Sequence, residues 1–111
     1  MQKKLFSYRP GQILHDNNNH PMMIVNARHS IVEVNQAAAF ALETSTEAIL
    51  GSYAPDFFNL NISRWTEALN SLNAQVERSI PHPLNFDLQI IPLTNRMGKI
   101  KRYAILLFPL D

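Results

Sequence analysis

The sequence predicts an α+β fold, because its segments run in the order strand, strand, several short helices and then about three strands. The strand-like run IVEVN (31–35) leads directly into the Ala-rich, helix-like run QAAAFAL (36–42). Further along, residues 84–90 (LNFDLQI) alternate between apolar and polar, and residues 100–110 (IKRYAILLFPL) are largely apolar, as expected of strands. Between residues 42 and 84, apolar residues recur at intervals of three and four, which is typical of an amphipathic helix: Ile62, Trp65, Leu69, Leu72 and Val76.

Length and composition are those of one folded domain, since the chain has 111 residues, of which 46% are hydrophobic and 17% charged. Its net charge of +1 provides no bulk attraction to nucleic acid or to an anionic membrane, so neither is expected as a partner. The longest apolar run, Tyr103–Leu110, is far shorter than the roughly 20 residues of a membrane span. Within the first eleven residues (MQKKLFSYRPG) the apolar stretch is only Leu5 and Phe6, which argues against a signal peptide and for a cytoplasmic location.

The residue types argue against an enzyme. The chain contains no Cys, which excludes disulfides, thiolate catalysis and Cys-type metal sites. With only three Gly, a phosphate-binding loop is not expected, and no nucleophile elbow is present. No two of the four His have the spacing of metal ligands on a helix or hairpin, so we expect them at the surface or in turns and expect no metal site.

Residues 1–20 are expected to form an N-terminal arm or short helix, and residues 21–111 the folded core. The RPG sequence at 9–11 interrupts any helix in the arm, and the polar run HDNNNHP at 15–21 is rich in turn formers. Two short strands then follow at 21–26 and 31–35, and the turn between them predicts a hairpin.

Local signals predict the helix starts. Asn35 can accept a hydrogen bond from a free N–H of the helix after it, and we favour this capping role over ligand contact. Thr44 and Glu47 have the spacing of a capping box for a second short helix that ends at Gly51. Residues 75–80 (QVERSI) fit either the end of the long helix or a strand, and we favour the strand.

Two segments in this order resemble a PAS domain, the sensory module of many signalling proteins. Residues 21–58 resemble its first half, and residues 88–111 (LQIIPLTNRMGKIKRYAILLFPLD) resemble its last two strands. The positions on the family's pattern are Asn35, Ala37, Gly51, Pro92, Gly98 and Asp111. The chain departs from it by a shortened middle-strand region and at Asn26, where an acidic residue is usual, at Glu43, where Gly is common, and at Pro109 and Leu110.

The resemblance implies a five-stranded antiparallel sheet with short helices on one face. It implies a sensory function, with a signal passing through the last strand to a C-terminal output domain such as a histidine kinase of a two-component system or a cyclic-di-GMP enzyme. The family's flavin photoreceptors need a reactive Cys, whose absence excludes that adduct chemistry. The family's haem sites usually offer an axial His on the long helix, and residues 62–74 contain none, so haem is not expected and the cofactor stays unknown.

Two functional hypotheses from different classes follow. In the first, a cavity between helices and sheet binds a small ligand, although aromatic residues at helical spacing are more often simple core. The candidate lining residues are Asn35, Phe40, Phe57, Phe58, Trp65, His82, Phe86 and Leu88. In the second, the core is fully packed and the domain is a ligand-free dimerisation or protein-interaction module.

The second hypothesis depends on the last strand. Both alternating sets of its residues are largely apolar, so one set must point away from the core and be covered by the arm or by a second copy. The candidates for this cap or dimer surface are Leu5, Phe6, Ile13, Leu14, Tyr103 and Ile105. The basic residues Arg96, Lys99, Lys101 and Arg102 lie on a predicted hairpin and are interpreted as a solvated turn.

Overall fold

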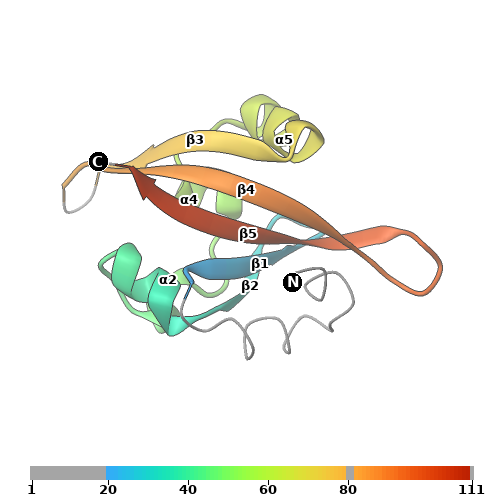
Figure 1. Ribbon diagram of the computed structural model, residues 1–111, viewed down its shortest axis with the longest axis horizontal. Coiled ribbons are helices and arrows are strands. Elements are labelled where there is room, and N and C mark those ends of the chain that lie inside the picture. Colours follow the sequence, from blue (N-terminus) through green and yellow to red (C-terminus); the bar gives the residue numbers. More distant parts are fainter. Residues whose placement is uncertain (1–19, 80–81, 111) are drawn as a thin grey trace.

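A five-stranded antiparallel sheet forms the centre of the molecule, which a computed structural model describes over residues 20–79 and 82–110. The strands follow one another across the sheet in the order β2-β1-β5-β4-β3 (Figure 1). Their bounds are β1 Met22–Asn26, β2 Ile31–Val34, β3 Asn73–Arg78, β4 Leu84–Thr94 and β5 Ile100–Leu110. The predicted α+β class with five antiparallel strands is therefore confirmed, and the apolar strand β5 is central, between β1 and β4.

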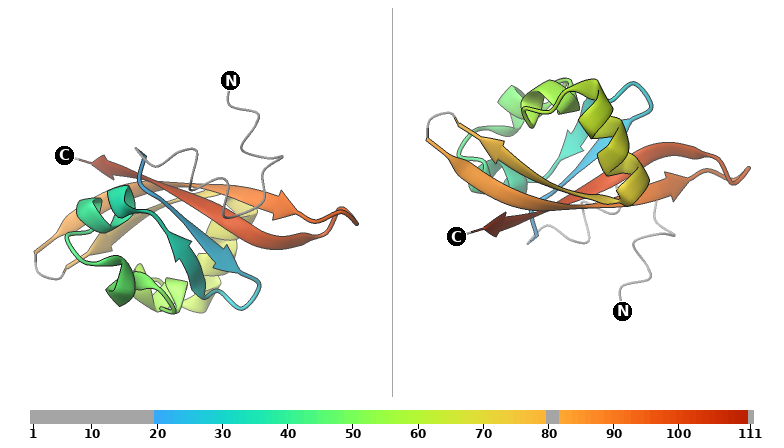
Figure 2. Two further views of the ribbon diagram at one scale, coloured as in Figure 1. Left: turned by 90° about the horizontal axis from the view of Figure 1, so that it is seen from below. Right: turned by 90° about the horizontal axis from the view of Figure 1, so that it is seen from above.

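In the described part of the chain, four short helices cover one face of the sheet (Figure 2). Their bounds are α2 Gln36–Ala41, α3 Thr46–Ile49, α4 Ala54–Phe57 and α5 Ile62–Ser71. Helices of this length are not stable alone, so their contact with the sheet holds them in place. The sequence patterns did not indicate α4, whose Pro55 stands in the first turn of the helix, where proline costs no hydrogen bond.

The long amphipathic helix is shorter than its pattern suggested. Helix α5 stops at Ser71 because Leu72 takes a left-handed conformation, with φ of 65°, and β3 begins at the next residue. Val76 therefore belongs to a strand, which confirms our preference for a strand in this segment. The start of α3 also differs: Ser45, rather than Thr44, accepts a hydrogen bond from the backbone N–H of Ala48.

The main core lies between the helices and the inner face of the sheet. Its largest fully buried side chains include Trp65, Phe58 and Phe86. Alternate residues of each strand point into this core, so Ile105 and Leu107 of β5 contribute to it. Burial of these apolar side chains is the main source of stability.

The outer face of the sheet carries a second, smaller cluster of buried apolar residues. Met22, Ile24, Leu93 and Ala104 form it, with Leu106 packed against them. Our placement of Tyr103 and Ile105 at the cap or dimer surface was therefore wrong, because both belong to the inner face and Ala104 and Leu106 are the outward set. The arm residues proposed to cover this face, Leu5, Phe6, Ile13 and Leu14, lie outside the described residues.

His20 should make the stability of the domain sensitive to pH. Burial lowers the pKa of His20 below its ordinary value of 6.5, and its Nε2 is buried without a hydrogen-bond partner among the described residues. The unfolded chain therefore binds a proton at higher pH than the folded chain, and the free energy of unfolding falls as the pH drops through 6.5. Urea unfolding at a series of pH values should show that the free energy of unfolding falls less steeply with decreasing pH in His20→Gln than in the unchanged protein. Equal slopes in the two proteins would contradict this role.

Candidate functional site

The space between helices and sheet holds the buried side chains of the main core. Trp65, Phe58, Phe86 and Leu88 are each at most 1% exposed and belong to the main core. Trp65 stacks on Phe58 with their ring centroids 6.3 Å apart, and its Nε1–H donates a hydrogen bond of 3.0 Å to Nδ1 of His29. Of these four, only Phe58 also lines a surface pocket that the structure describes. The other three are core residues rather than pocket residues.

Asn35 is the only buried polar residue in the described part of the chain, at 7% exposure. Its Oδ1 accepts hydrogen bonds from the backbone N–H of Ala38, at 2.9 Å, and of Met22, at 3.2 Å. Its Nδ2 donates to the carbonyl oxygen of His20 at 2.7 Å. The side chain thus caps α2 and ties that helix to the start of β1, as the capping interpretation predicted, and it does not line a described pocket.

Two predicted pocket residues lie on the surface instead. Phe40 is 86% exposed because it points away from the sheet on α2, whose buried face is made by Ala38 and Ala39. His82 is exposed, and its Nε2 lies 2.8 Å from a carboxylate oxygen of Glu43. Glu43 itself has a left-handed backbone with φ of 57°, which explains why Gly is common at this point of the pattern.

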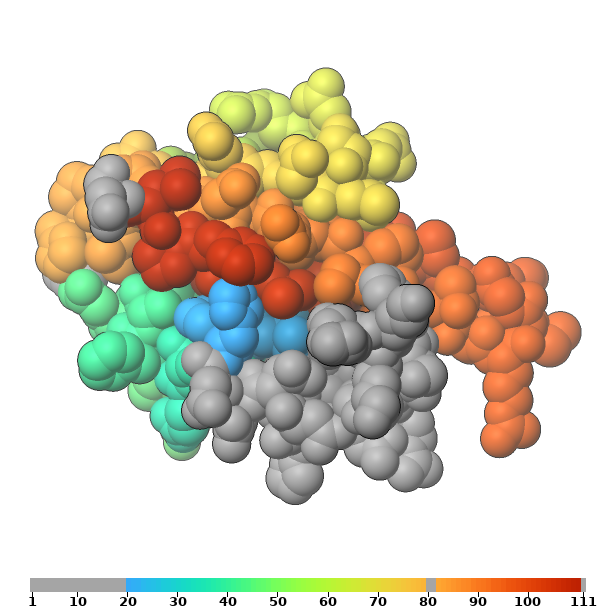
Figure 3. Space-filling view, viewed as in Figure 1, coloured from blue at the N-terminus to red at the C-terminus, as the bar shows by residue number. Residues whose placement is uncertain are grey.

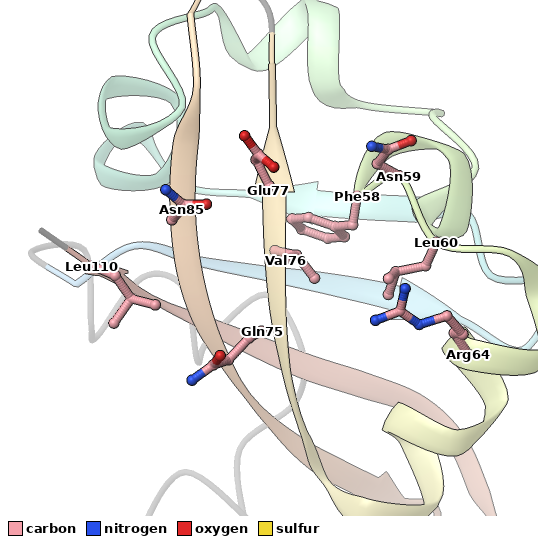
Figure 4. A pocket seen from close by; sticks show the side chains of 9 residues that line it. All are labelled: Phe58, Asn59, Leu60, Arg64, Gln75, Val76, Glu77, Asn85 and Leu110. Atoms are coloured by element: carbon pink, nitrogen blue, oxygen red, sulfur yellow. The ribbon is translucent and has the colours of Figure 1, made fainter.

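A pocket lies at the free edge of β3, the outermost strand of the sheet (Figure 4). Its volume is about 460 Å³. On the helix side it is lined by Phe58, Asn59, Leu60, Arg64 and Val76, and around the edge of the strand by Gln75, Glu77, Asn85 and Leu110. We call this pocket the edge groove.

Two smaller pockets continue the edge groove along the same strand. One, of about 210 Å³, shares Leu60, Arg64 and Gln75 with it, and the other, of about 200 Å³, shares Asn59. The backbone of β3 adds polar groups to this surface. The Ile90 N–H donates to Leu72 C=O, so these two residues form a hydrogen-bonded pair, and along an antiparallel ladder such pairs alternate with pairs that are not hydrogen-bonded to each other. By this alternation the N–H and C=O groups of Gln75 and Glu77 point away from β4, toward the groove.

Charge and hydrogen-bonding groups dominate the edge groove. Arg64 and Glu77 carry opposite charges, while Asn59, Gln75 and Asn85 offer amide donors and acceptors. Phe58 and Leu60 supply an apolar wall on the helix side, as Figure 4 shows. Such a lining suits a small polar molecule with both donor and acceptor groups.

Arg78 lines the pocket of about 200 Å³ together with Phe57, which it contacts. Its guanidinium lies over the Phe57 ring, 3.8 Å from the centroid, and its Nη1 donates to the carbonyl oxygen of Phe57. Burial lowers the pKa of Arg78, whose Nε is buried without a hydrogen-bond partner in residues 20–79 and 82–110. The side chain therefore links the C-terminal end of β3 to α4.

Replacing Arg78 by Ala is expected to lower the free energy of unfolding by about 1–3 kcal/mol, through loss of a charge-assisted hydrogen bond and a cation–π contact. Urea unfolding measures this difference. Arg64→Ala is the matched control, because Arg64 is exposed and its change should stay within about 0.5 kcal/mol. Equal losses in the two variants would contradict the linking role of Arg78.

Sequence reasoning missed most of the edge groove. Arg64, Glu77 and Asn85 are single polar residues on separate elements, without a motif that connects them in the sequence. The one available signal was the predicted strand at 75–80, and nothing in the sequence indicated that it lies at the edge of the sheet. Within residues 20–79 and 82–110, no group of three or more His, Asp or Glu could hold a metal ion, and no helix is long and apolar enough to span a bilayer.

Comparison with solved structures identifies the fold. The PAS domain of an HTR-like protein from Haloarcula marismortui has a TM-score of 0.65 and 16% identity, with 87% of this chain and 91% of that chain covered. A sensory box sensor histidine kinase from Vibrio cholerae has a TM-score of 0.60 and 17% identity, with coverage of 91% and 89%. An RNA-binding light-oxygen-voltage receptor has a TM-score of 0.73 and 13% identity, covering 98% of this chain and 34% of that one.

Models of known protein families and curated proteins give no match to this sequence. The structural matches nevertheless cover most of the chain with TM-scores of 0.60 to 0.71, so the chain has the PAS fold. The predicted resemblance is confirmed at this level.

Proposed function

We propose that this chain is a cytoplasmic sensory domain of a larger signalling protein, and that it binds a small polar ligand in the edge groove. The ligand would control a C-terminal output domain, either a histidine kinase or a cyclic-di-GMP enzyme. The role is regulatory rather than catalytic. The PAS fold supports a sensory domain, and the packed main core favours the edge groove over an internal cavity as the ligand site.

One observation carries the link between ligand and output. Leu110, the last residue of β5, lines the same groove as Phe58 and Arg64. A ligand in the groove would thus contact both the α4–α5 region and the point where the chain leaves the sheet. If the ligand binds one arrangement of these parts more tightly than another, it shifts the equilibrium between them and so changes the output.

The ligand can be sought directly in the purified domain. We expect its mass under native conditions to exceed the mass after denaturation by that of a small molecule, or a saturable increase when a polar ligand is added. An absorption spectrum recorded alongside would identify a coloured cofactor. A native mass that equals the chain or a whole multiple of it, and that no added polar metabolite changes, would contradict ligand binding.

The second candidate function is dimerisation or protein interaction without a ligand. The observation that favours it is the apolar outer face of the sheet, where Val32, Ile91 and Leu106 are only partly buried beside the second cluster. We propose that this face, together with the N-terminal arm, pairs two copies about a two-fold axis. Deleting residues 1–15 should then change the oligomeric state or lower the solubility, and an unchanged state would exclude the arm from the interface.

A further inference from the structure

Four of the ten basic residues of the chain gather at the turn between β4 and β5. Residues 95–102 (NRMGKIKR), which we call the basic tip, contain Arg96, Lys99, Lys101 and Arg102, while all nine acidic residues lie elsewhere. The net charge of +1 hides this separation, because the rest of the chain has an excess of acidic residues. The basic tip is therefore a local region of positive charge on an almost neutral molecule.

The two long strands carry the basic tip away from the rest of the domain. Figure 1 shows the β4–β5 hairpin extending beyond the helices and the other strands, and Figure 3 shows its tip projecting from the body. A flat surface approaching from this end would meet the basic tip before any other described part of the molecule. The acidic excess of the remaining chain would favour the same orientation at a negative surface.

The turn at the tip is held by its own hydrogen bonds. Asn95 Oδ1 accepts from the backbone N–H of Met97, at 2.8 Å, and of Lys99, at 3.0 Å. The Asn95 N–H donates to Lys99 C=O, and Gly98 adopts a φ of 78° that Gly tolerates without strain. Because this turn is already ordered, docking it would cost little conformational entropy.

The basic tip presents apolar side chains beside basic ones, which is the combination found in protein segments that lie at a membrane surface. Met97 is 80% exposed at the turn, and Ile100 is 48% exposed beside it. Arg96, Lys99 and Lys101 are exposed and form no ion pair with any other described residue, whereas Arg102 lies 3.5 Å from Glu33. Three free cations thus surround an apolar side chain that nothing in the described structure covers.

We propose that the basic tip docks on the surface of a lipid bilayer that contains anionic lipids. Met97 enters the boundary between headgroups and acyl chains, and Arg96, Lys99 and Lys101 lie at the level of the lipid phosphates. A bilayer suits the tip better than a nucleic acid does, because a single-stranded nucleic acid site would use an aromatic side chain for base stacking and residues 95–102 contain none. The surface is independent of the edge groove and of any ligand there.

Co-sedimentation of the 111-residue chain with vesicles tests this proposal. We expect binding to vesicles of equimolar phosphatidylcholine and phosphatidylglycerol, weaker binding at high salt, and no binding to phosphatidylcholine alone. The double variant Lys99→Gln and Lys101→Gln should lower the partition coefficient by about 25-fold, from roughly fivefold for each cation. Met97→Ser should lower it by about tenfold through loss of apolar burial.

The matched control removes one exposed cation on another element, with Arg64→Gln, and is compared with Lys99→Gln alone. It should bind within about twofold of the unchanged protein, since Arg64 stands near the start of α5 and outside the basic tip. Three outcomes would overturn the proposal: equal binding to neutral and anionic vesicles, an equal loss in the control variant, or full binding by the Lys99 and Lys101 variant. Binding to single-stranded RNA that is unaffected by Met97→Ser, without vesicle binding, would assign the tip to nucleic acid instead.

Discussion

Replacing Trp65 by Ala is expected to lower the free energy of unfolding by about 3–5 kcal/mol, which is a large part of the stability of a small domain. The side chain is fully buried, and the cavity left behind would be bordered by Phe58 and the inner face of the sheet. The variant would also leave Nδ1 of His29 without its donor. Urea unfolding followed by far-ultraviolet circular dichroism measures the loss without depending on the only Trp as a reporter.

Two further variants make the Trp65 result specific. Trp65→Phe keeps most of the ring but removes the N–H donor, so its loss should be smaller than that of Trp65→Ala. Phe40→Ala is the matched control, since Phe40 is an aromatic residue that is 86% exposed and should contribute within about 0.5 kcal/mol. A greater loss for Phe40→Ala than for Trp65→Ala would contradict the placement of both residues.

Replacing Asn35 by Ala is expected to lower the free energy of unfolding by about 2–4 kcal/mol, because it removes a helix cap and leaves buried backbone groups unpaired. The backbone N–H groups of Met22 and Ala38 would lose their acceptor, and the carbonyl oxygen of His20 would lose a donor. Thermal and urea unfolding both report this loss. A role in ligand contact alone would leave the stability of the ligand-free domain unchanged.

Ser45 provides the control for Asn35. It caps α3 with one hydrogen bond, to the Ala48 N–H at 3.1 Å, and this bond is exposed. Ser45→Ala should therefore cost about 1 kcal/mol, the usual value for a cap alone. If the two variants lose the same stability, the additional bonds of Asn35 to Met22 and His20 do not contribute.

Much of the fold could be predicted from local patterns. Asn35 stands between a β-branched strand and an Ala-rich helix, so its capping role follows from its immediate neighbours. Alternation in β4 predicted that Phe86 and Leu88 share one face, and both are in the main core. These features depend on residues close in sequence, which explains why the sequence alone predicted them.

Other features depend on contacts that sequence does not reveal. Strand β5 is apolar on both faces, so its pattern could not decide whether Ile105 or Ala104 meets the helices. Phe40 lies on a helix of small buried residues, and only the docking of that helix turns its ring to solvent. The edge groove is lined by residues of α5, β3, β4 and the end of β5, and no spacing in the sequence indicates that these elements come together.

The central claim, that a small polar ligand acts through the edge groove, is tested most directly by nuclear magnetic resonance. Amide spectra of the nitrogen-15-labelled chain would be recorded during titration with a library of polar metabolites. We expect a saturable binder whose shifts gather at Phe58, Arg64, Glu77 and Leu110, the groove and the end of β5. A library in which no compound moves these amides, or in which shifts occur only at other parts of the molecule, would contradict the claim.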